Sequence, residues 1–213
     1  MAKEKFKTMH NVFDQFTNRN LYKLMSEGHF KGLVGQLNMG KESNVFIAER
    51  EDGSYVIVKI YRLENCDFNK MYDYLKYDSR YIKLSNKRRE VIFAWTQREF
   101  RNLLKAREAG VRVPTPYTFK FNILVEEFIG DEGGASKLKD LFPKEPEPFF
   151  DDLLKNLMKL AKAGLVHADL SAFNILNFRE KPYFIDFSQT TAYDNPNAED
   201  YLKRDIKNIC VFF

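Results

Sequence analysis

The sequence predicts an α+β fold of two lobes, with an antiparallel sheet in the first half and helices in the second. Residues 44–61 alternate apolar and polar side chains on either side of a Gly-containing turn, which indicates a β-hairpin. Residues 149–164 repeat apolar side chains at helical spacing, which indicates an amphipathic helix. Glycine and acidic residues concentrate in residues 130–136 between them. We therefore expect an N-terminal lobe over residues 1–130 and a C-terminal lobe over residues 131–213.

Length and composition indicate one catalytic unit. A chain of 213 residues can bury one core or two small lobes that share a cleft. Its 44% apolar and 30% charged residues are typical of a globular protein, and its net charge of +4 permits an anionic partner without requiring one. Cys66 and Cys210 lack metal or redox spacing, no run of 18 apolar residues exists, and the Lys-rich start is not a signal peptide. We expect a cytoplasmic protein with no membrane partner.

The N-terminal lobe is predicted to hold a helical element, a sheet and a long helix. Apolar residues within residues 1–30 have helical spacing and include Val12 and Phe16. Strands follow over residues 33–50 and 55–61. Residues 62–93 are rich in tyrosine and show little periodicity, so we expect a flexible, partly ordered insertion there. A helix from about residue 90 to 109 follows, because a glycine stands directly after its last apolar turn.

The rest of the chain alternates short strands, loops and helices. Pro114 and Pro116 predict a loop, and the apolar run over residues 121–130 predicts a buried strand. Two short strands are expected on either side of the turn near residues 179–181. A closing helix is expected over residues 197–213, where apolar residues again recur at helical spacing.

One segment carries the spacing H-x-D-x-x-x-x-N, which phosphotransferases use to hold ATP and magnesium. Asp169 would orient and deprotonate a hydroxyl nucleophile, and Asn174 would offer a carbonyl oxygen to a metal. Asp186 follows a short apolar strand and would give its carboxylate to the same Mg²⁺, which prefers hard oxygen ligands. We expect His167, the first residue of the motif, to hold this loop by hydrogen bonds rather than to transfer protons.

Lys59 lies inside an apolar strand, where a lysine is costly unless it meets an anion. An edge-strand lysine that extends its amine to solvent is the alternative. Its expected partners are the phosphates of ATP and a glutamate on the helix of residues 90–109. We favour Glu99 for this glutamate over Glu90 and Glu108.

The segment of residues 39–45 joins two strands ahead of Lys59. Gly40, Lys41, Ser43 and Val45 would form a loop whose backbone N–H groups and hydroxyl cover the phosphates. A simple hairpin turn is the alternative interpretation of the same residues.

Taken together, these segments resemble the RIO family of atypical protein serine/threonine kinases. The resemblance spans almost the whole chain and rests on residues 40–45, 58–61, 97–103, 127–130, 166–176, 185–189 and 201–209. Because no winged-helix module precedes the kinase core in this sequence, the chain resembles the first branch of the family. Two positions depart from the family pattern. Glu126 stands where a bulky apolar residue is usual behind the adenine, and Ala172 replaces a common glutamate.

The resemblance implies a trimmed two-lobe protein-kinase-like fold that lacks the activation and peptide-docking segments. It implies a serine/threonine kinase that uses ATP and Mg²⁺, phosphorylates itself on serine and acts in maturation of the small ribosomal subunit. It also implies ATPase activity through a phosphorylated aspartate, here Asp186. Backbone groups of Glu127 and Ile129 would meet the adenine, and Leu176 would be a further nucleotide contact.

Two other functions remain open on the sequence alone. Aminoglycoside-type kinases share the H-x-D-x-x-x-x-N spacing, although Ser171 and the short segment after Asp186 argue against such a small-molecule phosphotransferase. A nucleotide-gated module that binds pre-ribosomal RNA is the other alternative, and the tyrosines of residues 72–81 would then contact RNA or serve only as a lid. The expected partners are accordingly protein substrates, including the chain itself, and precursor particles or RNA of the small ribosomal subunit.

Overall fold

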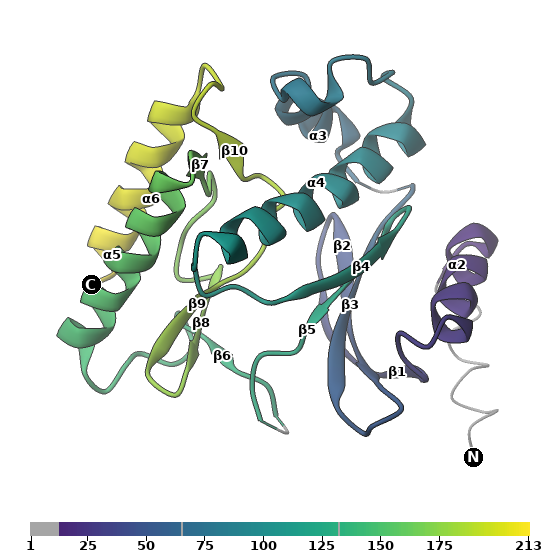
Figure 1. The fold of residues 1–213 in the computed structure, drawn as a ribbon, viewed down its shortest axis with the longest axis horizontal. Coiled ribbons are helices and arrows are strands. Elements are labelled where there is room, and N and C mark those ends of the chain that lie inside the picture. The colour runs from purple at the N-terminus through teal and green to yellow at the C-terminus, as the bar shows by residue number, and fades with distance from the viewer. Residues whose placement is uncertain (1–12, 65, 132) are drawn as a thin grey trace.

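The computed structural model describes residues 13–64, 66–131 and 133–213 (Figure 1). Helix α2 (Gln15–Ser26) begins at Asp14, whose carboxylate accepts hydrogen bonds from the backbone N–H groups of Phe16 and Thr17. The predicted N-terminal helical element is confirmed for this part. The remainder of that prediction, including Val12, lies outside the described residues.

A five-stranded antiparallel sheet lies in the first half of the molecule (Figure 1). Its strands, in spatial order, are β1 (Gly32–Met39), β2 (Ser43–Glu49), β3 (Tyr55–Tyr61), β5 (Ile123–Glu127) and β4 (Pro116–Lys120). The predicted hairpin of β2 and β3 is confirmed, and its register places Lys59 opposite Val45 on one side and Leu124 on the other. The sheet therefore holds Lys59 in its interior rather than on an edge strand.

The loop that the prolines predict after residue 114 is wrong, because strand β4 lies there. Pro116 is the first residue of β4, and β4 is the edge strand of the sheet. A proline has no N–H to give to a strand ladder, but an edge strand needs ladder bonds on one side only. The buried strand predicted over residues 121–130 is present as the shorter β5.

Helix α4 (Arg88–Glu108) crosses between the sheet and the second half of the chain, as Figure 1 shows. It confirms the predicted long helix. The expectation of a flexible, partly ordered segment over residues 62–93 is wrong. Helix α3 (Phe68–Leu75) and a 3₁₀ turn (Ser79–Tyr81) occupy it, and α3 buries Met71 and Leu75 against α4.

The second half contains helices α5 (Pro146–Lys162) and α6 (Ala198–Phe212), which overlap in the view of Figure 1 and share one apolar cluster. The strands of two small sheets come before α5 or between α5 and α6 in the sequence. One consists of β6 (Ser136–Lys137), β8 (Ile175–Phe178) and β9 (Lys181–Phe184), and the other of β7 (Leu165–Val166) and β10 (Thr191–Ala192). Strands β8 and β9 are the two short strands predicted around residues 179–181, and the closing helix is confirmed as α6.

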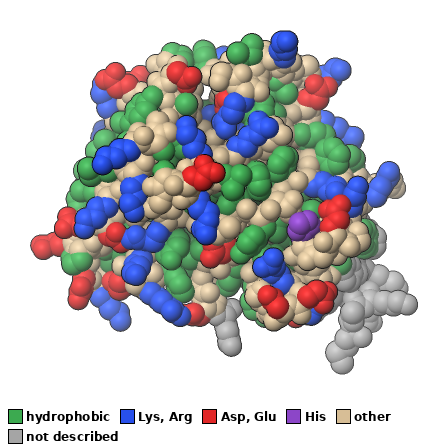
Figure 2. Space-filling view, in the orientation of Figure 1, with side chains coloured by type: hydrophobic (Ala, Val, Ile, Leu, Met, Phe, Trp, Pro, Cys, Tyr) green, Lys and Arg blue, Asp and Glu red, His purple; other side chains and the backbone are tan. Residues whose placement is uncertain are grey.

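Apolar clusters join these elements into one structure. The largest cluster joins the end of α4 to α5, the β8–β9 hairpin and α6, and includes Leu103, Leu153 and Phe184. A second cluster packs α2 against the sheet through Leu24 and Val58. The face shown in Figure 2 carries many lysine and arginine side chains with acidic ones among them. In the part of the chain that the structure describes, no helix is both long and apolar enough to cross a membrane.

Candidate active site

A cavity of about 670 Å³ opens between the five-stranded sheet and the loops of the second half. Every predicted site residue except Glu99 contributes to its wall. They are Gly40, Lys41, Ser43, Val45, Lys59, Glu127, Ile129, Asp169, Asn174, Leu176 and Asp186. Glu99 lies directly behind the wall, where it contacts Lys59. The fold therefore brings together residues that are up to 146 positions apart in the sequence, from Gly40 to Asp186.

Lys59 is buried between two carboxylates. Its Nζ lies 2.8 Å from Oε1 of Glu99 on α4 and 3.0 Å from Oδ1 of Asp186. Burial alone would lower the pKa of Lys59, but the charges of Asp186 and Glu99 outweigh it and hold the pKa well above its usual value. Lys59 is therefore a fixed cation at the inner end of the cavity.

Tyr61 supports this arrangement and was not predicted from the sequence. It lies two residues after Lys59 on the same face of β3, and its hydroxyl donates a hydrogen bond to Oε2 of Glu99. The carboxylate of Glu99 thus has a partner for each oxygen although its side chain is almost fully buried. Burial raises the pKa of Glu99, whereas Lys59 and the hydrogen bonds act to lower it. The period-2 spacing of Lys59 and Tyr61 was the available signal.

Asp186 occupies a strained backbone position that aims its side chain at Lys59. Its φ of 63° lies in the left-handed region, which aspartate tolerates better than most residues. Oδ1 accepts hydrogen bonds from Lys59 and from the Ser188 hydroxyl, at 3.0 and 2.7 Å. Burial would raise the pKa of Asp186, but Lys59 and Ser188 hold it at about 2. The carboxylate is therefore ionised across the physiological range.

Asp169 and Asn174 face each other across the loop that precedes β8. The amide Nδ2 of Asn174 donates to Oδ2 and to the backbone carbonyl of Asp169, at 2.9 and 2.8 Å. Burial, followed by the nearby charge of Asp186, raises the pKa of Asp169. Because Asn174 uses its nitrogen for Asp169, its carbonyl oxygen is left to act as a ligand.

These groups fit a magnesium ion that has two protein ligands. The Asn174 carbonyl oxygen and Oδ2 of Asp186 accept no hydrogen bond from the described residues, and both residues line the cavity. Mg²⁺ favours hard oxygen ligands and commonly takes the rest of its shell from phosphates and water. No group of three or more His, Cys, Asp or Glu side chains in the described chain forms a metal cage.

Helix α6 holds the loop that carries Asp169. The buried carboxylate of Asp205 accepts hydrogen bonds from the N–H groups of Ala168 and Leu170, at 2.8 and 2.9 Å. Arg204 donates to the carbonyl of Ala168. His167 has the structural role that the sequence predicts, because its Nε2 lies 3.1 Å from the carbonyl of Ile185, its side chain is buried, and burial lowers its pKa to about 4.

Helix α4 holds the loop that carries Asp186. The Asn102 amide donates to the carbonyls of Phe187 and Thr190, at 3.1 and 2.8 Å, and Arg98 donates to the carbonyl of Ser188 at 3.2 Å. Both side chains are fully buried. Sequence reasoning missed these residues and Asp205. The signal for the α4 pair was the placement of Arg98 and Asn102 at the helical spacing of the apolar residues Trp95 and Leu103.

The segment after β5 turns sharply beside the cavity. Gly130 has a φ of 137°, and a Cβ there would lie 2.3 Å from the backbone nitrogen of Ala135, so no other residue fits without a shift of the backbone. The Ile129 carbonyl accepts a hydrogen bond from Ala135 N–H. The N–H of Ile129 donates to none of the described residues, so it is available to a molecule in the cavity.

The loop between β1 and β2 forms another part of the cavity wall. Gly40 N–H donates to the carbonyl of Ser43 at 2.9 Å, and a Cβ at Gly40 would lie 3.0 Å from that oxygen. The glycine thus permits a tight turn that directs Lys41 and Ser43 into the cavity wall.

Comparison with known proteins identifies the fold and the family. The RIO domain family matches residues 44–213. Two similar solved structures are those of Rio2 kinase from Chaetomium thermophilum, one of them a complex with ADP, Mg²⁺ and phosphoaspartate. The complex has a TM-score of 0.70 and 26% identity, and the other structure has a TM-score of 0.71 and 25% identity. They match 91% and 90% of this chain, which spans 58% and 59% of theirs. The expected α+β, two-lobe, kinase-like fold is confirmed.

Curated relatives of similar sequence carry the same family name. The RIO-type serine/threonine-protein kinase Rio1 of Methanocaldococcus jannaschii is 41% identical over 99% of this chain and 72% of its own length. The Rio1 kinase of Haloferax volcanii is 38% identical over 99% of this chain and 73% of its own length. The rio1 kinase of Schizosaccharomyces pombe is 36% identical over 97% of this chain, which spans 43% of that protein. The chain therefore belongs to the RIO family of serine/threonine-protein kinases.

Proposed function

We propose that the cavity binds ATP with Mg²⁺ and that the chain transfers the γ-phosphoryl group to a serine or threonine, including serines of its own. The observation that carries this proposal is the position of Lys59 between Glu99 and Asp186, at 2.8 and 3.0 Å, at the inner end of a cavity that Asp169 and Asn174 also line. A buried cation that is fixed by two carboxylates is suited to hold the phosphates of a nucleotide.

The predicted site residues have separate roles in this proposal. Lys59 holds the phosphates, and Glu99 fixes the position of Lys59. Asp169 accepts the proton of the attacking hydroxyl, while the hydrogen bond from Asn174 fixes its orientation. Asn174 and Asp186 would hold Mg²⁺, which when bound neutralises charge on the phosphoryl oxygens. Catalysis then depends mainly on position and electrostatics.

The nucleotide base would lie between the loop of residues 39–45 and the turn at Gly130. The N–H of Ile129 is free to donate to the base, a backbone group of Glu127 would be its second contact, and Val45 and Leu176 would pack against the ring. The roles of Gly40, Lys41 and Ser43 are to cover the phosphates.

An ATPase cycle that passes through an aspartyl phosphate is part of the proposal. The Rio2 kinase complex contains phosphoaspartate together with ADP and Mg²⁺. The corresponding group in this chain would be Asp186, whose carboxylate is ionised and reaches the cavity. We further propose protein substrates, precursor particles or RNA of the small ribosomal subunit as partners, and a reducing cytoplasm in which Cys66 and Cys210 stay free.

Transfer from γ-labelled ATP tests the proposal. The wild-type chain should retain label in the presence of Mg²⁺, and Asp169→Asn should reduce the rate at least 100-fold while it still binds ATP. Asp186→Ala should abolish both metal-dependent binding and transfer. Glu108→Gln, on the exposed end of α4, is the matched control and should transfer at the wild-type rate. Equal labelling of wild type and Asp186→Ala would refute the assignment.

A further inference from the structure

Glu126 is a carboxyl group in the cavity that the proposed mechanism does not use. Its side chain lines the cavity and makes no hydrogen bond or ion pair with any residue that the structure describes. The neighbouring Glu127 differs, because its carboxylate accepts hydrogen bonds from the N–H and the hydroxyl of Thr115, at 2.9 and 2.6 Å. The carboxyl group of Glu126 is thus left to meet whatever molecule fills the cavity.

Glu126 lies in the part of the cavity that the proposed function assigns to the nucleotide base. On β5 it pairs with Ile57 of β3, two residues before Lys59, and it comes three residues before Ile129 with its free N–H. Ile57, Lys59 and Ile129 all line the same cavity. A nucleotide whose phosphates meet Lys59 and whose base meets Ile129 would present the edge of its base to Glu126.

The charges around Glu126 favour its protonated form. Burial and the negative charge of Glu99 on α4 raise its pKa to about 8, with a further contribution from Asp186, while Lys59 on β3 acts in the opposite direction. A neutral carboxyl group offers one O–H donor and one carbonyl acceptor. It therefore matches the two-point hydrogen bonding of a glutamine amide.

We propose that Glu126 determines base specificity by pairing with the exocyclic 6-amino group and N7 of adenine. Adenine offers a donor and an acceptor on this edge, the pattern that a glutamine side chain recognises with two hydrogen bonds. Guanine offers two acceptors there, O6 and N7, so one of them would face the acceptor oxygen of Glu126 without a donor. This inference rests on the proposed ATP site and deepens it.

The test is the ratio of dissociation constants for the imidodiphosphate analogues of GTP and ATP with Mg²⁺, measured by isothermal titration calorimetry. The ratio should exceed about tenfold in favour of the ATP analogue for the wild type. Glu126→Gln should keep this ratio, because the amide presents the same donor and acceptor. Glu126→Leu should lower the ratio about tenfold, mainly through weaker binding of the ATP analogue. The control Glu108→Gln should match the wild type.

The failures of the two proposals are distinguishable. If the wild-type chain binds neither analogue, the proposed function is wrong. If Glu126→Leu binds the analogues with a ratio within twofold of the wild type, the assignment of Glu126 is wrong and the nucleotide site stands. Should leucine block binding of both analogues, Glu126→Ala replaces it, because it only shortens the side chain. The alanine variant should show the same tenfold drop, and an unchanged ratio would overturn the inference.

Discussion

At the scale of single residues, the site depends on a buried cation whose partners are also buried. Lys59 and Glu99 are 7% and 1% exposed, so neither charge is stabilised by water. Their mutual attraction compensates the loss of hydration only because the geometry is good and Tyr61 satisfies the second oxygen of Glu99. Removal of one partner leaves the other charge uncompensated.

Lys59→Met is therefore expected to cost about 3 kcal/mol of unfolding free energy and to abolish phosphoryl transfer. Adding Glu99→Gln should recover part of the lost stability, since a neutral amide is less costly to bury than an unpaired carboxylate. Urea denaturation measures both effects.

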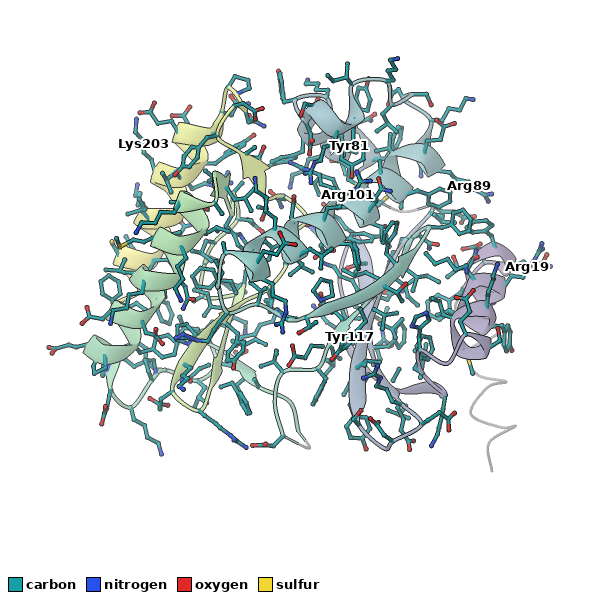
Figure 3. All side chains as sticks on the ribbon, in the orientation of Figure 1. Arg19, Tyr81, Arg89, Arg101, Tyr117 and Lys203 are labelled. Carbon is teal, nitrogen blue, oxygen red and sulfur yellow. The ribbon has the colours of Figure 1, made fainter. Side chains whose placement is uncertain are left out.

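Lys203→Met is the matched control for this substitution. Lys203 forms an ion pair with Glu199 on the exposed surface of α6, at 2.6 Å, and lies at the outer edge of the molecule in Figure 3. It should leave the free energy of unfolding close to that of the wild type, because both partners of this ion pair are exposed to solvent. A loss for Lys59→Met no larger than that of Lys203→Met would show that the buried pair has no special role.

Glu126 should make stability depend on pH. Its pKa is about 8 in the folded chain against an ordinary value of 4.5, so the folded state keeps a proton that the unfolded state loses. The free energy of unfolding should therefore fall as pH rises from about 4.5 to about 8, and this contribution is complete above pH 8.

Glu126→Leu removes that contribution. The free energy of unfolding of the variant, minus that of the wild type, should therefore increase from pH 6 to pH 9. Urea denaturation of both proteins at the two pH values measures this difference. A wild type and variant whose stabilities change in parallel over this range would contradict the raised pKa.

At the scale of elements, segments with a regular spacing of apolar residues were predictable, and segments without such spacing were not. The alternation of β2 and β3 and the apolar stripe of α5 each encode one buried face, so the sequence predicts them well. Strand β4 was missed because Pro116 suggests a loop, and only the order of strands shows that it lies at an edge. A strand order depends on long-range pairing that one sequence does not display.

Helix α3 was missed for a different reason. Its buried side chains include Met71, Tyr74 and Leu75, but two of its eight residues are tyrosines whose polar ends disguise the apolar face. The tyrosine-rich segment also packs on α4, where Arg101 lies over the ring of Tyr81 (Figure 3). Packing of this kind depends on the position of α4 rather than on local pattern.

Both catalytic loops are held by helices that lie outside the motif. Asp205 on α6 accepts hydrogen bonds from the N–H groups on either side of Asp169, and Asn102 on α4 donates to two carbonyls of the loop after Asp186. Both side chains contact backbone groups of the loops, which every residue type carries. The side chains of the catalytic motif therefore do not indicate these partners. Asp205 and Asn102 fix the backbone of the two loops that bring Asp169 and Asp186 to the same cavity.

Asp205→Asn tests the first of these contacts. An amide has one acceptor oxygen for two N–H groups and turns its own NH₂ toward one of them, so we expect a loss of about 1–3 kcal/mol in unfolding free energy. Phosphoryl transfer should fall by tenfold or more, because the position of Asp169 shifts.

Urea denaturation and single-turnover transfer measure these two effects separately. Asp151→Asn, on the exposed surface of α5, is the control and should change neither. Wild-type transfer by a destabilised Asp205→Asn would mean that Asp205 has only a structural role.

At the scale of the whole molecule, the cavity exists only when both halves of the chain are folded together. Lys59 comes from the sheet, Glu99 from α4, and Asp169 and Asp186 from loops of the second half. Sequence spacing predicted the identity of these residues because each motif is short. It did not predict the 3.0 Å contact of Lys59 with Asp186, which depends on how α4 sets the two halves against each other.

Nucleotide binding should therefore stabilise the whole chain in one transition. At an ATP-analogue concentration 100 times the dissociation constant, the gain is about 2.7 kcal/mol, which corresponds to a rise in Tm of roughly 5–10 °C for a chain of this size. Lys59→Met should show no rise under the same conditions. Differential scanning calorimetry in Mg²⁺ measures the shift, and an equal rise for wild type and variant would place the nucleotide elsewhere.

The central claim is that Asp169, Asn174, Asp186 and Lys59 form one phosphoryl-transfer site. Tandem mass spectrometry of the chain after incubation with ATP and Mg²⁺ tests it most directly, because it identifies the residue that receives the phosphoryl group. We predict a phosphorylated serine or a phosphorylated Asp186 in the wild type, and neither in a chain that carries Asp169→Asn and Asp186→Ala. Phosphorylation of the double variant to the wild-type level, or an unmodified wild type that leaves ATP intact, would contradict the account.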